Sequence, residues 1–146
     1  LVELVAVLAV LAVLGVAAMP LAELSWQRDR ERELKRALWE IRDAIDAHKR
    51  AADAGLIEKV GDGYPSSLEA LTAGVALRGA RSGERRYFLR RLPRDPFAPD
   101  SAAADKAWGV RSAASPPERP APGADVFDVY SQSNAVGLNG VPLRQW

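Results

Sequence analysis

The sequence contains no cysteine, a single histidine and a single methionine among its 146 residues. The lack of cysteine excludes structural disulfides, thiol redox motifs and metal sites built from thiolates. With His48 as the only histidine, one chain cannot form a multi-histidine zinc site or a two-histidine iron site. Composition therefore excludes several classes of enzyme before any motif is considered.

The sequence also lacks an excess of charge of either sign. It has 20 Lys and Arg against 19 Asp and Glu, a net charge of +1 and a pI of about 8.3. Nucleic-acid-binding domains normally have a pI above about 9 and a continuous basic face, so no nucleic-acid partner is expected. The length suffices for one small domain.

One segment near the N-terminus has no charge at all, because residues 4–22 are all apolar, Gly or Pro between Glu3 and Glu23. A helix of these 19 residues spans about 28 Å, close to the roughly 30 Å of a bilayer's hydrocarbon core. The run is longer than that of a cleavable signal peptide, and the rest of the chain is too small and charged to bury it. The sequence therefore predicts a membrane-spanning helix, with an ordinary single-pass anchor as the plainest interpretation.

Glu3 is unexpected for a plain anchor. A carboxylate deep in a bilayer costs about 2.5 to 3.5 kcal/mol. No basic residue lies near it in the sequence, so its expected partner is a cation on another chain. The start Leu-Val-Glu-Leu-Val, the Val/Leu/Ala run, Gly15 and Pro20 resemble the mature N-terminus of type IV pilins and type II secretion pseudopilins.

This resemblance implies that the apolar helix is both a membrane anchor and the core of a filament. Glu3 would neutralise the N-terminal amine of a neighbouring subunit. A full match places about two more residues, Phe-Thr or similar, before Leu1, and the amine that the family methylates would belong to the first of them. Gly15 and Pro20 weaken the helix, Pro20 by about 3 kcal/mol, so the interval between them is expected to melt in a filament, or else simply to kink.

The next residues predict that the helix continues to about Asp53, because apolar side chains recur at helical intervals of three and four. They are Leu34, Leu38, Ile41, Ile45, His48 and Ala52. His48 is expected to be a packed histidine with one satisfied nitrogen. We predict a pilin-like α+β fold, in which a long N-terminal helix, apolar in its first half and amphipathic in its second, packs against a small antiparallel β-sheet. The expected divisions are 1–25 for the membrane and filament-core helix, 26–54 for its amphipathic half and 55–146 for the head.

Four features of the head carry the expectations for its elements. Ser66 and Glu69 have the spacing of a reciprocal helix cap. Residues 87–89, Tyr-Phe-Leu, are β-prone, and residues 126–131 predict the clearest strand. The β-prone run at residues 87–89 is expected to end at residues 92–97, Leu-Pro-Arg-Asp-Pro-Phe. The Tyr-Pro-Ser segment, residues 92–97, the Asp-Val-Tyr-Ser strand and Trp146 resemble the G-type major pseudopilin.

Residues 78–94 hold seven arginines and one acidic residue. The stretch is either a docking patch for an acidic surface of the adjacent subunit or the solvated face of a strand and its loops. The candidates for contacts between subunits are Arg85, Arg86, Arg90 and Arg91.

Arginines just beyond the apolar run would place the head in the cytoplasm by the positive-inside rule. The resemblance places it in the periplasm, with the anchor in the bacterial inner membrane, and we follow the resemblance because these cations alternate with acidic residues.

No catalytic constellation is present, so an enzyme is not expected. Relatives of the G type often bind calcium after the Asp-x-Tyr-Ser strand, and a calcium ion requires six to eight oxygen ligands. Residues 132–140 contain no carboxylate. We therefore expect no cofactor and no tight metal site, although Asp125, Asn134 and carbonyl oxygens could hold calcium weakly.

The sequence thus favours a structural subunit of a type II secretion pseudopilus, methylated at its N-terminus and drawn from a pool in the inner membrane. Its expected partners are copies of itself in a helical homopolymer, minor pseudopilins, the inner-membrane assembly platform, prepilin peptidase and, before assembly, the lipid bilayer. A type IV pilus subunit for adhesion or motility stays an alternative, as does a plain membrane-anchored periplasmic binding domain.

Overall fold

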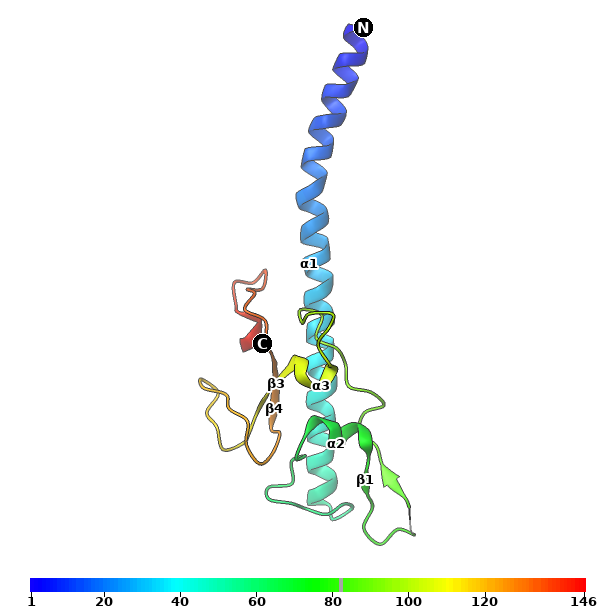
Figure 1. Ribbon diagram of the computed structural model, residues 1–146, viewed down its shortest axis with the longest axis vertical. Coiled ribbons are helices and arrows are strands. Elements are labelled where there is room, and N and C mark those ends of the chain that lie inside the picture. The colour runs from blue at the N-terminus through cyan, green and yellow to red at the C-terminus, as the bar shows by residue number, and fades with distance from the viewer. Residues whose placement is uncertain (82) are drawn as a thin grey trace.

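A single helix dominates the computed structural model, which describes residues 1–81 and 83–146. This helix, α1 (Val2–Asp53), has 52 residues. Figure 1 shows α1 as a gently curved rod whose N-terminal half projects alone, while the rest of the chain gathers around its C-terminal half. The predicted long helix and the α+β class are therefore confirmed.

The C-terminal half of α1 buries the apolar stripe that the sequence predicts. All six of its members are buried: Leu34, Leu38, Ile41, Ile45, His48 and Ala52. The stripe's leucines and isoleucines pack with Leu71, Val129 and Leu143 in one hydrophobic cluster. Half of the head's core is thus supplied by the helix that also carries the apolar N-terminal segment.

The second helix, α2 (Leu68–Ala73), starts differently from the prediction. Its N-cap is Ser67, whose Oγ accepts a hydrogen bond from the Ala70 N–H at 3.2 Å. The predicted cap formed by Ser66 and Glu69 is wrong. The helix begins one residue later than predicted, and in this position it buries both Leu68 and Leu71. Both serines satisfy the same rule locally, and the packing of the helix selects between them.

Two antiparallel pairs of strands complete the described residues. The shorter elements are β1 (Val75–Ala76), β2 (Arg85–Arg86), α3 (Ala104–Ala107), β3 (Trp108–Arg111), β4 (Asp128–Ser131) and the 3₁₀ helix η1 (Leu143–Gln145). β1 pairs with β2, and β3 pairs with β4. The sequence predicted one sheet, whereas the described residues, 1–81 and 83–146, form two. They pack at different levels of α1: Val75 lies against Ala51 and Ala52, whereas Val129 belongs to the main core.

The tripeptide at residues 87–89 is not a strand, contrary to its composition. The backbone N–H groups of Phe88 and Leu89 both donate to the Leu71 carbonyl oxygen, at 3.1 and 3.0 Å, and so satisfy the end of α2. Donors used in this way are not available for a strand ladder. The strand predicted over residues 126–131 is confirmed for its last four residues, as β4.

His48 is packed as the sequence predicts. Its side chain is 7% exposed, its ring lies 5.1 Å from that of Phe88, and its Nδ1–H donates to the Gly63 carbonyl oxygen at 3.0 Å. The hydrogen bond assigns the proton to Nδ1 when the ring is neutral. His48 thus connects the last turns of α1 to the turn that follows.

We expect the stability of the head to fall on mild acidification. Burial lowers the pKa of His48 below its ordinary value, and the hydrogen bond to Gly63 opposes this only in part. The unfolded state therefore takes up a proton first, so the stabilisation is complete above a pH of about 6.5 and is lost as the pH falls toward the folded-state pKa. The urea midpoint of the full chain in detergent should drop between about pH 7.5 and 5.5. His48→Gln should flatten this dependence, and a midpoint that stays constant in the native sequence would contradict it.

Candidate assembly surface

The N-terminal half of α1 is an uncovered apolar surface. Every residue from Val2 to Trp26 is exposed, and an 18-residue window reaches a mean hydropathy of 2.7 with none of its residues buried. Among the described residues, α1 is the one helix that is long enough and apolar enough to cross a membrane. Such a surface requires lipid or other helices around it, because water exposure of this area is strongly unfavourable.

Glu3 lies in the first turn of this exposed segment. The first turn of a helix has backbone N–H groups without partners in the helix, and it is the positive end of the helix dipole. None of the ion pairs formed within residues 1–81 and 83–146 includes Glu3. The carboxylate is therefore presented outward, where a second chain can reach it.

Gly15 and Pro20 both lie inside the continuous helix. A Cβ atom at Gly15 would meet no atom within 4 Å, so no contact within the chain requires a glycine there. Pro20 has no N–H, and the carbonyl of Val16 consequently has no donor one turn later. Melting between these residues stays a prediction for the assembled state.

The four predicted contact arginines are all exposed, and their role between subunits stays a prediction. The Arg85 Nη2 donates to the Gly74 carbonyl oxygen at 2.7 Å, and the guanidinium of Arg86 lies 5.6 Å from the centre of the Phe88 ring. Both therefore support the β1–β2 hairpin. Arg90 and Arg91 are exposed, and only Arg91 of the four lines a cleft against α1.

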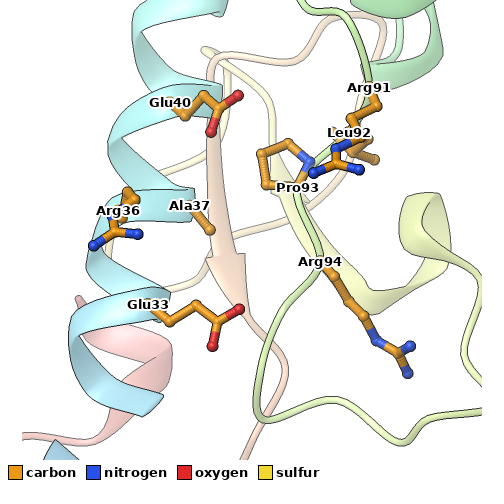
Figure 2. Close-up of a pocket in the computed structure, with 8 residues that line it drawn as sticks. All are labelled: Glu33, Arg36, Ala37, Glu40, Arg91, Leu92, Pro93 and Arg94. Atoms are coloured by element: carbon orange, nitrogen blue, oxygen red, sulfur yellow. The ribbon is translucent and has the colours of Figure 1, made fainter. Parts of the chain in front are cut away.

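That cleft has mixed charge and a volume of 510 Å³. Its walls are Glu33, Arg36, Ala37 and Glu40 of α1 and the segment Arg91, Leu92, Pro93 and Arg94. Figure 2 shows the carboxylates of Glu33 and Glu40 turned toward this segment, whereas Arg94 points away from them. Arg94 instead meets Asp100 at 3.2 Å. The cleft thus offers two carboxylates and Arg91 to a partner with charges of both signs.

Three charged residues that the sequence did not single out hold the head together. Arg42 donates to Asp128 Oδ1 at 2.7 Å, to the Val129 carbonyl oxygen at 3.1 Å and to the Trp146 carbonyl oxygen at 2.8 Å. These bonds join β4 and the C-terminal residue to α1. A charged residue within a charged helix gives no sequence signal for such a role.

Glu31 and Asp95 act in the same way. Glu31 Oε1 accepts from the Leu138 N–H at 2.8 Å, and thereby attaches the loop before η1 to α1. Asp95 is 1% exposed and accepts from the Ser131 hydroxyl at 2.6 Å and from the Phe97 N–H at 2.8 Å. A buried carboxylate with two donors fixes the loop of residues 92–97 onto β4.

The residues named for weak calcium binding do not converge. Asp125 precedes β4 and Asn134 follows it, so the strand separates them. One carboxylate oxygen of Asp125 accepts hydrogen bonds from the Ser112 hydroxyl and the Ala113 N–H. No group of three or more His, Asp or Glu side chains suited to a metal occurs among residues 1–81 and 83–146. The absence of a tight calcium site stays a prediction.

Comparisons of the chain with models of known protein families, with curated proteins and with solved structures returned no match. The features of the chain that bear most directly on function are the uncovered apolar helix, the outward carboxylate of Glu3 and the mixed-charge cleft.

Proposed function

We propose that this chain is a structural, non-enzymatic subunit of a pseudopilus filament in type II protein secretion. One observation carries the proposal: a single unbroken helix of 52 residues has an uncovered apolar half with Glu3 at its start, and a second half that is the core of a small head. A plain anchor needs neither the carboxylate nor the continuity. A flexible linker would serve a tethered binding domain equally well.

The proposed cycle uses the apolar helix twice. A basic leader is removed by prepilin peptidase, and the subunit waits in the inner membrane with residues 4–22 in lipid and its head in the periplasm. An assembly platform driven by ATP then extracts the subunit. The helix passes from lipid into a bundle of identical helices, so its apolar area stays out of water at both stages. Glu3 gains its cation only in the second stage.

The heads would then stack through charged surfaces, alone or with minor pseudopilins. The cleft lined by Glu33, Glu40 and Arg91 is the best candidate, because it offers both signs of charge without using bonds that hold the fold. Exposed ion pairs contribute at most about 1 kcal/mol each. Such contacts therefore set the register between heads, while the helices supply most of the association energy. The lack of cysteine favours this filament over a type IV pilus, because many pilins have a C-terminal disulfide.

The N-terminus of the protein from native membranes tests the proposal. Intact-mass and peptide mass spectrometry should find a terminus one or two residues before Leu1, produced by removal of a short basic leader, with one added methyl group. An uncleaved upstream segment would contradict the proposal. Cleavage after Ala22 would also contradict it, since the head would then be a secreted domain.

A further inference from the structure

A loop of the head near the C-terminus presents apolar side chains to solvent. Val136, Leu138 and Val141 are 51%, 42% and 38% exposed. Residues 132–143 contain no charged residue, although 27% of the whole chain is charged. Exposed apolar side chains grouped on an uncharged segment indicate an interaction surface rather than ordinary surface variation.

Hydrogen bonds within the loop satisfy part of the backbone at its tip. The Gly137 N–H donates to the Val141 carbonyl oxygen and the Gly140 N–H to the Gly137 carbonyl oxygen, both at 2.9 Å. The Val141 N–H donates to Asn139 Oδ1 at 3.0 Å. Most N–H groups at the tip therefore have partners within the chain, which lowers the cost of moving the tip into a less polar environment.

Hydrogen bonds place the loop beside the part of α1 that follows the apolar segment. Glu31 Oε1 accepts from the Leu138 N–H at 2.8 Å and from the Gln27 side chain at 3.1 Å, so the loop lies level with residues 27–31. Trp26 and Ala135 line the same 790 Å³ hollow. Figure 1 shows this red segment reaching further toward the N-terminal end of α1 than any other part of the head.

This position matches the polar layer of a bilayer. At 1.5 Å per residue, Gln27 lies about 7.5 Å beyond Ala22, where the apolar run ends. The headgroup layer of one leaflet is about 5 to 7.5 Å thick. The indole of Trp26, 71% exposed, lies at the same depth, where tryptophan is favoured. Membrane helices tilt by about 20° on average, and a tilt toward the side of the loop would lower the loop toward that layer.

We propose that the loop of residues 136–141 docks on the lipid headgroups of the membrane that the subunit's own helix spans. The inference rests on the proposed membrane-anchored state. The bilayer is the occupant that fits, because the loop is uncharged, presents apolar side chains and lies level with the part of α1 that directly follows the apolar run. Docking holds the head tilted toward the membrane before assembly, and extraction of the helix releases it.

The absence of cysteine allows a direct test with single-cysteine variants of the full chain. An environment-sensitive fluorophore is attached at Leu138→Cys. As a control, it is attached at Arg119→Cys, at an exposed position in the proline-rich residues 115–124. A third probe at Leu11→Cys reports insertion of the helix. Each protein is reconstituted in phosphatidylcholine and phosphatidylglycerol vesicles that contain a lipid with a quencher near its headgroup or in its acyl chain.

We expect the headgroup-level quencher to reduce the Leu138 signal at least about twofold more than the Arg119 signal, with a blue-shifted emission. Val141→Glu should abolish the difference. Equal quenching at both positions, with Leu11 quenched by the acyl-chain quencher, would overturn docking while leaving the anchor intact. Absence of quenching at Leu11 would overturn the anchor itself, and docking with it. A blue shift that grows with protein density without lipid quenching would assign the loop to a second copy and overturn docking on lipid.

Discussion

Glu3→Ala should abolish filament assembly and leave the amount of membrane-bound subunit unchanged. In the free subunit the carboxylate lies in the first turn of an exposed helix, and in the described residues it joins no ion pair. In a helix bundle an uncompensated carboxylate costs about 2.5 to 3.5 kcal/mol, so its retention requires a cation from another chain. Loss of that pair leaves the partner cation buried and alone, and we expect filament yield to fall about a hundredfold.

The measurement is the amount of filament sheared from cells, compared with the subunit content of the membrane. Glu23→Ala is the matched control, because Glu23 is an exposed carboxylate at the other end of the same apolar run. It should assemble normally. Normal assembly of the Glu3→Ala protein would contradict the prediction, because assembly would then not depend on a partner for this carboxylate.

Asp95→Ala should destabilise the head by about 3 kcal/mol. The substitution removes the acceptor of the Ser131 hydroxyl and of the Phe97 N–H, and Asp95 is 1% exposed. Hydrogen bonds to a charged acceptor contribute about 1.5 to 3 kcal/mol, and a buried donor without a partner carries a desolvation cost. The free energy of unfolding is obtained from urea titration of the full chain in detergent, followed by tryptophan fluorescence, to which the buried Trp108 contributes.

Two variants bound the interpretation of this measurement. Asp100→Ala removes a carboxylate whose side chain is fully exposed, and its effect should stay within about 0.5 kcal/mol. Asp95→Asn keeps one acceptor oxygen, and its loss of unfolding free energy should lie between those of Asp100→Ala and Asp95→Ala. A change of less than about 1 kcal/mol for Asp95→Ala would show that water or a neighbouring group replaces the lost acceptor.

Much of α1 could be predicted, because its signals are local and periodic. The apolar run, the stripe from Leu34 to Ala52 and the packed His48 follow from spacing alone, and the structure confirms these predictions. The head was less predictable. Residues 87–89 have strand composition but satisfy the end of α2 instead, and two adjacent serines competed for one helix cap. In both cases tertiary packing decided between local alternatives.

The candidate site divides in the same manner. Glu3 stands out in sequence because a charge interrupts an apolar segment. The mixed-charge cleft could not be predicted, because Glu40 and Arg91 come from segments about fifty residues apart. Glu31 and Arg42 resembled solvated charges of an amphipathic helix, yet their partners Leu138 and Trp146 arrive more than a hundred residues later. No spacing rule reports such long-range contacts.

The shared core also has a consequence for biosynthesis. Leu34 and Leu143 belong to one hydrophobic cluster, so the stripe of α1 is not covered until almost the entire chain has been made. At about 5 to 20 residues per second, the ribosome needs roughly 5 to 20 s to advance from the end of α1 to Leu143. During that interval the nascent chain exposes an apolar helix face next to an apolar membrane segment. Early delivery to the membrane, before the head can fold, would shorten the time for which both surfaces face water.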